Sequence, residues 1–295
     1  MLENTINGIE IAASIRSDLR TSVEAFSKES GVPPSLAVIL IGDNPASAVY
    51  VRNKEKACAE VGITTQSFTL PASTTEQQLL ELVEKLNSDS NFHGILVQLP
   101  LPPHIRPSKI INHLNPSKDV DGLHPTNMGL LLAGSPYLVP CTPAGIQELL
   151  LRSGHLPDGK HVVICGRSDI VGKPIAALLV QRNDRANATV SICHSQTPNL
   201  SHITRQADIL IAAIGKPNTI TADMVKEGVV VIDVGINRIP DNTRKSGHRL
   251  VGDVDYTNIQ SKASGITPVP GGVGPMTIAM LLQNTLTAAQ AQLLP

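Results

Sequence analysis

Hydrophobic positions along the first half of the chain follow two patterns, one typical of amphipathic helices and one typical of buried strands. A helical pattern over residues 8–28 precedes the apolar run SLAVILIG at 35–42, and a second helix is predicted from Pro45 to about Gly62. A third helix over 75–88 leads into GILVQLPLP at 94–102, an apolar strand that ends at prolines. Strands that alternate with helices in this way predict an α/β unit.

The second half repeats the alternation more regularly. Its predicted strands are HVVICG, ATVSIC, ADILIAAIG and VVVIDVGI, and helices are expected from Pro174, near Leu200 and at TADMVKEG. Such a series is typical of a Rossmann-type, doubly wound parallel sheet.

Proline and glycine interrupt residues 100–143, and we place the passage between two domains there. The first domain is predicted to cover residues 1–139 and to be completed by a C-terminal helix over 275–295, which has no strand of its own to cover. Residues 140–274 are predicted as the Rossmann-type domain. The active site is expected in a cleft between the two.

Composition excludes several classes of partner. The chain has 295 residues, a net charge of −1 and 41% hydrophobic residues, so it favours a small-molecule partner over nucleic acid or a membrane surface. We find no secretory signal and no apolar run long enough to span a membrane. Four scattered cysteines without a C-x-x-C pair indicate reduced thiols in a cytoplasm, and no metal site is expected.

Lys54 falls on the apolar face of its predicted helix, together with Tyr50, Ala57, Cys58 and Val61. Burial disfavours the charged form of an amine, so Lys54 is expected to exchange protons near neutral pH, as a catalytic group does. The alternative is a lysine whose stem packs against the helix and whose head reaches water.

The stretch GRSDIVGKP predicts a dinucleotide site, because Gly166, Ser168 and Gly172 stand where a βα turn brings backbone amides close to a pyrophosphate. The next strand lacks the terminal acid that an NAD ribose usually requires. Arg167 and Ser195 offer donors for a ribose phosphate instead, which favours NADP. An ordinary tight turn and a solvent-facing arginine remain the alternatives.

Three further polar or glycine-rich positions are candidates for binding. Gln98 interrupts the apolar strand, unless it lies at the exposed end of that strand. Asp121 precedes a glycine in DVDG and either binds a ligand or fixes an Asx-type turn. PGGVGPMT at 270–277 either lets a flat ligand approach the backbone or is a plain loop at a helix entry.

Taken together, these motifs resemble the bifunctional methylenetetrahydrofolate dehydrogenase/cyclohydrolase family. The stretches that carry the resemblance are YVRNKEKACAEVGI from Tyr50, GILVQLPLP, DVDG, PCTPAGI, GRSDIVGKP, CHS from Cys193, ADILIAAIGKP, VIDVGIN, GDVD and PVPGGVGPMT. The resemblance implies a cytoplasmic homodimer that acts on tetrahydrofolate derivatives. It would oxidise a methylene bridge with NADP and then hydrate the methenyl product to the formyl derivative.

The resemblance also implies roles for single residues. Tyr50 corresponds to the aromatic that stacks on the folate, Lys54 to the catalytic lysine, Gln98 to the residue that adjusts it, and Asp121 to the carboxylate that holds the pterin. Further substrate contacts are expected at Pro270, Gly271 and Gly272. Cofactor contacts are expected at Gly166, Arg167, Ser168, Gly172, Ser195 and Ile236.

Other interpretations stay open. Gln196 stands where many members of the resembled family have Lys or Arg, which weakens the preference for NADP and leaves NAD possible. Arg182 and Arg185 either compensate for it or are solvated surface. The rival functions are a dehydrogenase-only member of the same family, an NAD(P)-dependent dehydrogenase of a hydroxy or amino acid, and a nucleotide-sensing module.

Overall fold

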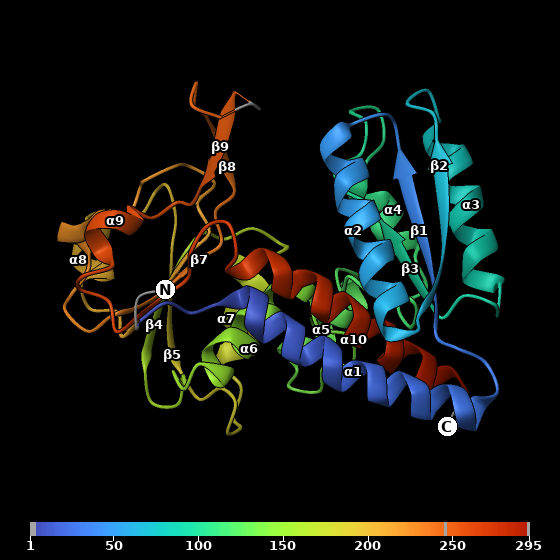
Figure 1. The fold of residues 1–295 in the computed structure, drawn as a ribbon, viewed down its shortest axis with the longest axis horizontal. Coiled ribbons are helices and arrows are strands. Elements are labelled where there is room, and N and C mark those ends of the chain that lie inside the picture. The colour runs from blue at the N-terminus through green and yellow to red at the C-terminus, as the bar shows by residue number, and fades with distance from the viewer. Residues whose placement is uncertain (1–3, 245–246, 294–295) are drawn as a thin grey trace. The chain divides into compact units, whose positions relative to one another are not determined.

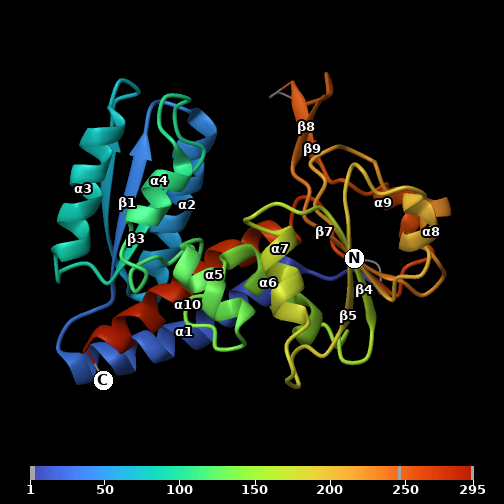
Figure 2. The same cartoon turned by 180° about the vertical axis from the view of Figure 1, so that it is seen from behind.

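The computed structural model describes residues 4–244 and 247–293 (Figures 1 and 2), and these residues form two compact α/β units. The three-stranded unit comprises residues 13–141 and 278–293, and the five-stranded unit comprises residues 4–12 and 142–277. Two α/β units with parallel sheets confirm the predicted fold class.

The three-stranded unit has a parallel sheet in the order β2-β1-β3. Its strands are β1 (Ser35–Ile41), β2 (Thr64–Leu70) and β3 (Gly94–Val97), and its helices are most of α1 (Gly8–Ser30), α2 (Pro45–Val61), α3 (Glu76–Ser88), α4 (Pro107–His113), α5 (Pro125–Leu132) and the end of α10 (Val273–Leu293). Helices α2 and α3 lie on opposite faces of this sheet, as Figures 1 and 2 both show.

The alternation of side chains in the strands decides which residues face α3 and which face α2. Ile39 and Ile95 are buried in one core cluster with Leu79 and Val83 of α3. Successive residues of a strand point to opposite faces, so the side chain of Gln98, which follows β3, belongs to the α2 face. The sheet therefore directs this amide toward the helix that carries Lys54.

The end of α10 is tied to the three-stranded unit by amide side chains. Asn284 is buried and donates to the carbonyl oxygens of Val120 and Val139, both at 2.8 Å. Gln292 donates to the carbonyl oxygen of His93 at 2.8 Å. These bonds satisfy backbone acceptors in three separate segments of the unit, and one of these acceptors, Val120, directly precedes Asp121.

The five-stranded unit has a wholly parallel sheet in the order β10-β7-β6-β4-β5. The strands of this sheet are β4 (His161–Cys165), β5 (Thr189–Cys193), β6 (Ile209–Ala212), β7 (Val230–Asp233) and β10 (Gly265–Ile266). A separate antiparallel hairpin is formed by β8 (Asn237–Pro240) and β9 (His248–Val251). The helices are α6 (Cys141–Arg152), α7 (Gly172–Leu179), α8 (Leu200–Thr204), the 3-10 helix η1 (Ala222–Met224) and α9 (Tyr256–Ile259). The strand order reverses at β4, which therefore marks the topological switch point.

The N-terminal residues join the five-stranded unit. Ile6 donates its N–H to the carbonyl oxygen of Ile266 at 2.9 Å, beside β10. The sequence interpretation had assigned the whole of 1–139 to the first domain.

Several elements differ from the sequence-based expectations. The apolar run at 94–102 forms a strand only as far as Val97, and TADMVKEG forms one 3-10 turn rather than a helix. The segment 100–143 contains α4 and α5, each begun by a proline at its first turn. Within residues 4–244 and 247–293, no helix combines the length and the apolar character needed to cross a membrane.

Candidate active site and dinucleotide pocket

Lys54 and Gln98 form a direct pair in the three-stranded unit. Lys54 is half-buried in the middle of α2, and its Nζ donates to Oε1 of Gln98 at 3.0 Å. Nε2 of Gln98 donates to the carbonyl oxygen of Leu99 at 2.7 Å, so both ends of the amide are engaged and its oxygen is directed at the amine. The pair thus places a basic nitrogen in a defined position at the carboxyl edge of the sheet.

Two buried thiols lie near the lysine. Cys58, one turn further along α2, is fully buried, and burial raises its pKa to about 12 despite the opposing charge of Lys54. Burial also raises the pKa of Cys141 well above its usual range; the carboxylate of Asp121 adds to this, and Lys54 opposes it. Both thiols are therefore protonated at neutral pH and are not nucleophiles. Because Lys54 and Asp121 both act on Cys141, the amine and the carboxylate lie in one electrostatic neighbourhood.

The two carboxylates of the DVDG turn make different contacts. Asp119 is 1% exposed, and its Oδ2 accepts from the N–H of His124 at 2.7 Å and from Nδ2 of Asn127 at 2.9 Å. Gly122 has a φ of +73° and donates its N–H to the carbonyl oxygen of Asp119 at 3.0 Å, which closes the turn. The side chain of Asp119 therefore braces this turn, and Asp121 is half-buried beside Cys141.

An isolated bridge ties the DVDG turn to the strand that leads to Gln98. Asp119 forms this parallel bridge with Ile95 of β3, and the chain turns directly after it. Asp121 therefore lies in a turn that begins beside β3.

Tyr50 lies one helical turn before Lys54 and is 44% exposed. The helix wheel had placed it on the apolar face with Ala57, Cys58 and Val61; those three are buried, whereas Tyr50 is exposed. An aromatic ring with this exposure offers a flat apolar surface to a ligand.

A pocket of about 530 Å³ opens at the switch point of the five-stranded unit. It is lined by residues that follow three strands: Cys165, Gly166, Arg167 and Ser168 after β4, Cys193, His194, Ser195 and Leu200 after β5, and Ala213, Ile214, Lys216 and Thr219 after β6. In open parallel sheets, ligands bind at this edge and at this point.

Glycine lets the backbone close tightly around the pocket. Gly166 has a φ of +142°, and a Cβ there would stand 2.2 Å from the carbonyl oxygen of Ala213. A Cβ at Gly172 would stand 2.2 Å from the carbonyl oxygen of Gly166. Ser168 Oγ accepts from the N–H of Val171 at 3.2 Å, so this hydroxyl caps the start of α7.

The polar groups of the pocket suit a phosphorylated dinucleotide. Arg167, Ser195 and Lys216 line it, and no lining residue is acidic. Guanidinium, hydroxyl and ammonium donors match phosphate oxygens, whereas a ribose diol usually requires a carboxylate. Lys216 was missed from the sequence; its signal is the Gly-Lys-Pro that follows β6.

Other predicted contacts lie elsewhere in the five-stranded unit. Gly172 and Ile236 are outside the pocket lining, and Ile236 is exposed. Arg185 pairs with Glu148 of α6, which gives it a structural partner.

The PGG segment packs closely against the start of α1. Gly271 has a φ of +107°, and a Cβ at Gly272 would stand 2.7 Å from the carbonyl oxygen of Pro268. A Cβ at Gly8 would stand 1.8 Å from the carbonyl oxygen of Gly272. Close packing therefore accounts for Gly272, and Pro270 is exposed.

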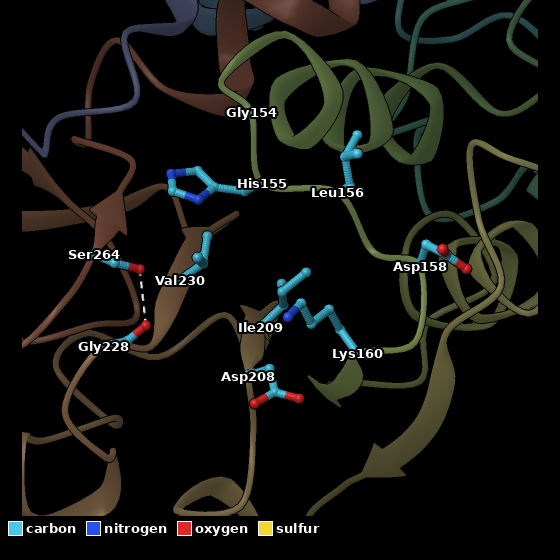
Figure 3. A pocket seen from close by; sticks show the side chains of 10 residues that line it. All are labelled: Gly154, His155, Leu156, Asp158, Lys160, Asp208, Ile209, Gly228, Val230 and Ser264. Carbon is cyan, nitrogen blue, oxygen red and sulfur yellow. Dashed lines mark hydrogen bonds between the residues drawn. The ribbon is translucent and has the colours of Figure 1, made fainter.

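A second pocket of the five-stranded unit, of about 440 Å³, lies at the opposite, amino edge of the sheet (Figure 3). His155 lines it, and burial lowers the pKa of this histidine. Asp208 accepts from the N–H of His161 at 2.8 Å and from Nζ of Lys226 at 2.6 Å. Because its carboxylate is already engaged, we assign no chemistry to this pocket.

The fold and the two sites define a two-unit α/β protein, with a dinucleotide pocket in the five-stranded unit and a lysine-centred site in the three-stranded unit. The catalytic-domain model of tetrahydrofolate dehydrogenase/cyclohydrolase matches residues 6–121, and the NAD(P)-binding-domain model of the same family matches residues 140–293. The chain therefore belongs to the tetrahydrofolate dehydrogenase/cyclohydrolase family, as the sequence motifs had indicated.

Individual relatives agree over almost the whole length. The bifunctional protein FolD of Chlorobium phaeobacteroides (strain BS1) is 56% identical over 283 residues, which cover 95% of each chain. The crystal structure of the bifunctional FolD enzyme from Campylobacter jejuni is 49% identical, covers 98% of this chain and 99% of its own, and has a TM-score of 0.91. The Trypanosoma brucei dehydrogenase-cyclohydrolase, solved with NADP and an inhibitor, is 40% identical, covers 100% of both chains and has a TM-score of 0.93.

Proposed function

We propose that this protein is a bifunctional folate enzyme. It oxidises 5,10-methylenetetrahydrofolate to 5,10-methenyltetrahydrofolate with NADP and then hydrolyses the product to 10-formyltetrahydrofolate. The observation that carries the proposal is the hydrogen bond from Lys54 to Gln98 in a chain whose two halves match the two domain models of the family.

Substrate binding is proposed to use Asp121 and Tyr50. The aminopyrimidinone edge of a pterin presents adjacent N–H donors, for which a carboxylate is a bidentate acceptor. Asp121 is half-buried and leaves the bracing of its turn to Asp119, so it can serve as that acceptor. The exposed ring of Tyr50 supplies the stacking surface. We also propose that Pro270, Gly271 and Gly272 contact the substrate through their backbone.

The oxidation requires positioning more than proton transfer. Lone pairs on the two folate nitrogens expel the hydride from the methylene carbon, and NADP, when bound, accepts it. The role of this chain is to hold the folate still: Asp121 fixes the pterin edge and Tyr50 fixes the ring plane.

The hydration requires a proton acceptor, and we propose that Lys54 serves. A water oxygen adds to the methenyl carbon, and the Lys54 amine takes the proton that this water releases. The same proton then goes to the ring nitrogen as its bond to the carbon breaks, and the hydroxyl proton of the adduct is released to water as the formyl carbonyl forms, so the amine returns to its starting state. The Gln98 carbonyl oxygen, at 3.0 Å, keeps the amine in position for both transfers.

NADP is the proposed cofactor because Arg167, Ser195 and Lys216 line the dinucleotide pocket and no lining residue is acidic. We propose backbone contacts from Gly166 and Ser168 at the same turn, and further contacts from Gly172 and Ile236. The three-stranded unit would then bind the folate through Tyr50 and Asp121, with further contacts from Pro270, Gly271 and Gly272 of the five-stranded unit, which would also bind the dinucleotide.

We further propose that the protein acts as a homodimer in the cytoplasm. All four cysteines are free thiols, which agrees with a reducing compartment. Light scattering on the purified chain would report a mass of about twice 31.3 kDa if it is dimeric.

One reaction followed at two wavelengths tests the proposed function. NADP and methylenetetrahydrofolate are mixed with the protein, and the absorbance of the methenyl compound and of NADPH is recorded together. A transient methenyl signal that decays after NADPH forms is the expected result. A persistent methenyl signal would mean a dehydrogenase alone, and no signal would favour the other dehydrogenases or a nucleotide sensor. Higher turnover with NAD than with NADP would contradict the cofactor proposal.

A further inference from the structure

Two buried carboxylates that take no part in the proposed chemistry lie behind the dinucleotide pocket. Asp233 is the last residue of β7, and Asp253 follows β9; they are 3% and 0% exposed. Burying a carboxylate is costly unless hydrogen bonds compensate, so the partners of these two side chains indicate their purpose.

The carboxylate of Asp253 holds the loop after β6. Its Oδ2 accepts from the N–H of Ile214 at 2.5 Å and from the N–H of Gly215 at 2.9 Å. Its Oδ1 accepts from Nδ2 of Asn237, the first residue of β8, at 2.8 Å. One side chain therefore fixes two successive amides at the start of the loop between β6 and η1.

Asp233 in turn positions Asp253. Its Oδ1 accepts from the backbone N–H of Asp253 at 2.9 Å, and its Oδ2 accepts from the N–H of Val254 at 3.0 Å. A Cβ at Gly252 would stand 1.7 Å from Oδ2 of Asp233, and a Cβ at Gly235 would stand 2.3 Å from Oδ1 of Asp253. Both glycines are thus required so that the carboxylates can lie this close to the backbone.

The loop that Asp253 holds forms one wall of the dinucleotide pocket. Ile214, Lys216 and Thr219 line the pocket, and Asp253 does not. The backbone of Asp253 also binds this loop, because its carbonyl oxygen accepts from the N–H of Ile220 at 3.1 Å. The hydrogen bonds of Asp253 therefore act on the pocket through the loop.

We propose that Asp253 is a positioning residue for dinucleotide binding: by anchoring the amides of Ile214 and Gly215, it holds the wall of the pocket and Lys216 in the geometry that NADP requires. The inference rests on the proposed NADP site at this pocket. It adds a residue that touches neither ligand nor reacting atoms, and it predicts a loss confined to the dinucleotide.

The main test is Asp253→Ala, with the Kd for NADP measured by calorimetry on the full-length protein. Without this acceptor the two loop amides must be ordered again each time NADP binds, so we expect the Kd to rise at least about tenfold. In steady-state oxidation, the KM for NADP should rise while the KM for methylenetetrahydrofolate stays unchanged. Hydration of methenyltetrahydrofolate, which needs no NADP, should keep its wild-type rate and shows that the variant is folded.

Asp253→Asn separates positioning from a general loss of packing. The amide oxygen can accept from both loop N–H groups if the Asn237 amide turns over to accept from the new NH₂ group. We expect this variant to stay within about threefold of the wild-type Kd.

Asp208→Ala is the matched control, because Asp208 also accepts a backbone N–H but lies at the amino edge of the same sheet. Its Kd for NADP should equal that of the wild type. If Asp253→Ala does not fold, Asp253→Ser keeps one short acceptor and should show a smaller rise of the same kind.

Two outcomes would overturn the inference. A folded Asp253→Ala variant whose Kd for NADP lies within about twofold of the wild type would show that the loop needs no anchor, and an unchanged Kd in Asp253→Ser would contradict the smaller rise expected there. An equal loss in Asp208→Ala would show that any damage to the sheet weakens binding. A wild-type protein that binds no NADP would instead refute the proposed function itself.

Discussion

The two carboxylates of the DVDG turn have different surroundings, so their alanine variants should have different effects on stability and on folate binding. Asp119→Ala removes a buried acceptor that receives the N–H of His124 and Nδ2 of Asn127. Asp121→Ala removes a half-buried carboxylate beside Cys141. We expect the first variant to lose stability and the second to lose folate binding.

The size of the stability loss can be worked out from the bonds. Two hydrogen bonds to a charged acceptor contribute about 1.5–3 kcal/mol each, or about 3–6 kcal/mol together. Burial raises the pKa of Asp119, which shows that the native state also bears a cost for holding this charge, and the alanine removes that cost. The net loss expected for Asp119→Ala is therefore about 3 kcal/mol. For Asp121→Ala it should stay below about 1 kcal/mol.

Urea unfolding measures the loss of unfolding free energy in both variants, and the affinity for folate is measured separately in native buffer. A shift in the unfolding midpoint with an unchanged slope would attribute the loss to the native contacts. The reasoning would be refuted if Asp119→Ala stayed within about 1 kcal/mol of the wild type, or if Asp121→Ala proved equally destabilised.

Three further predictions concern other sites. Glu76 accepts from Arg106 and Lys109, which lower its pKa, so its contribution to stability is fully present above its ordinary pKa of 4.5 and is lost progressively as the pH falls from there through the lowered pKa of the folded state. Glu76→Gln should therefore lower the unfolding midpoint near pH 7 and differ less from the wild type as the pH is lowered toward about 2, and a difference that does not shrink over this range would contradict the reasoning. Arg167→Ala should raise the KM for NADP by about tenfold or more and leave the KM for NAD unchanged, since only NADP carries the ribose phosphate; equal effects on the two cofactors would place Arg167 elsewhere. Gln98→Leu should slow hydration by at least about tenfold, because the amine loses its acceptor at 3.0 Å, and a wild-type rate would remove Gln98 from the mechanism.

The sequence predicted the elements whose patterns are strongly apolar and missed those whose patterns are mixed. Strand β2, TTQSFTL, lies at the edge of its sheet with several exposed positions, so it shows neither a buried run nor a clear turn signal. Helices α4 and α5 were taken for irregular chain because of their prolines, yet each proline stands at a first turn, where it favours a helix.

The candidate site was predicted by residue type, but its geometry required the fold. The period of 2 in β3 explains why Gln98 faces Lys54, and this could be reasoned only once β3 and α2 were known to lie together. Asp119 braces the turn and Asp121 is left half-buried beside Cys141. This difference depends on tertiary contacts such as the bridge between Asp119 and Ile95, which no local sequence pattern encodes. Lys216 was missed because a loop residue has no hydrophobic periodicity, and its one signal, the Gly-Lys-Pro after β6, identifies a pocket residue only once the strand order is known.

The proposed role of Lys54 in proton transfer is tested most directly by the rate of methenyltetrahydrofolate hydration in Lys54→Met. Lys56→Met on the same helix is the matched control, because Lys56 is exposed. We expect Lys54→Met to fold and to lose hydration by at least about a hundredfold, with Lys56→Met at the wild-type rate. Hydration at the wild-type rate by a folded Lys54→Met protein would contradict the mechanism.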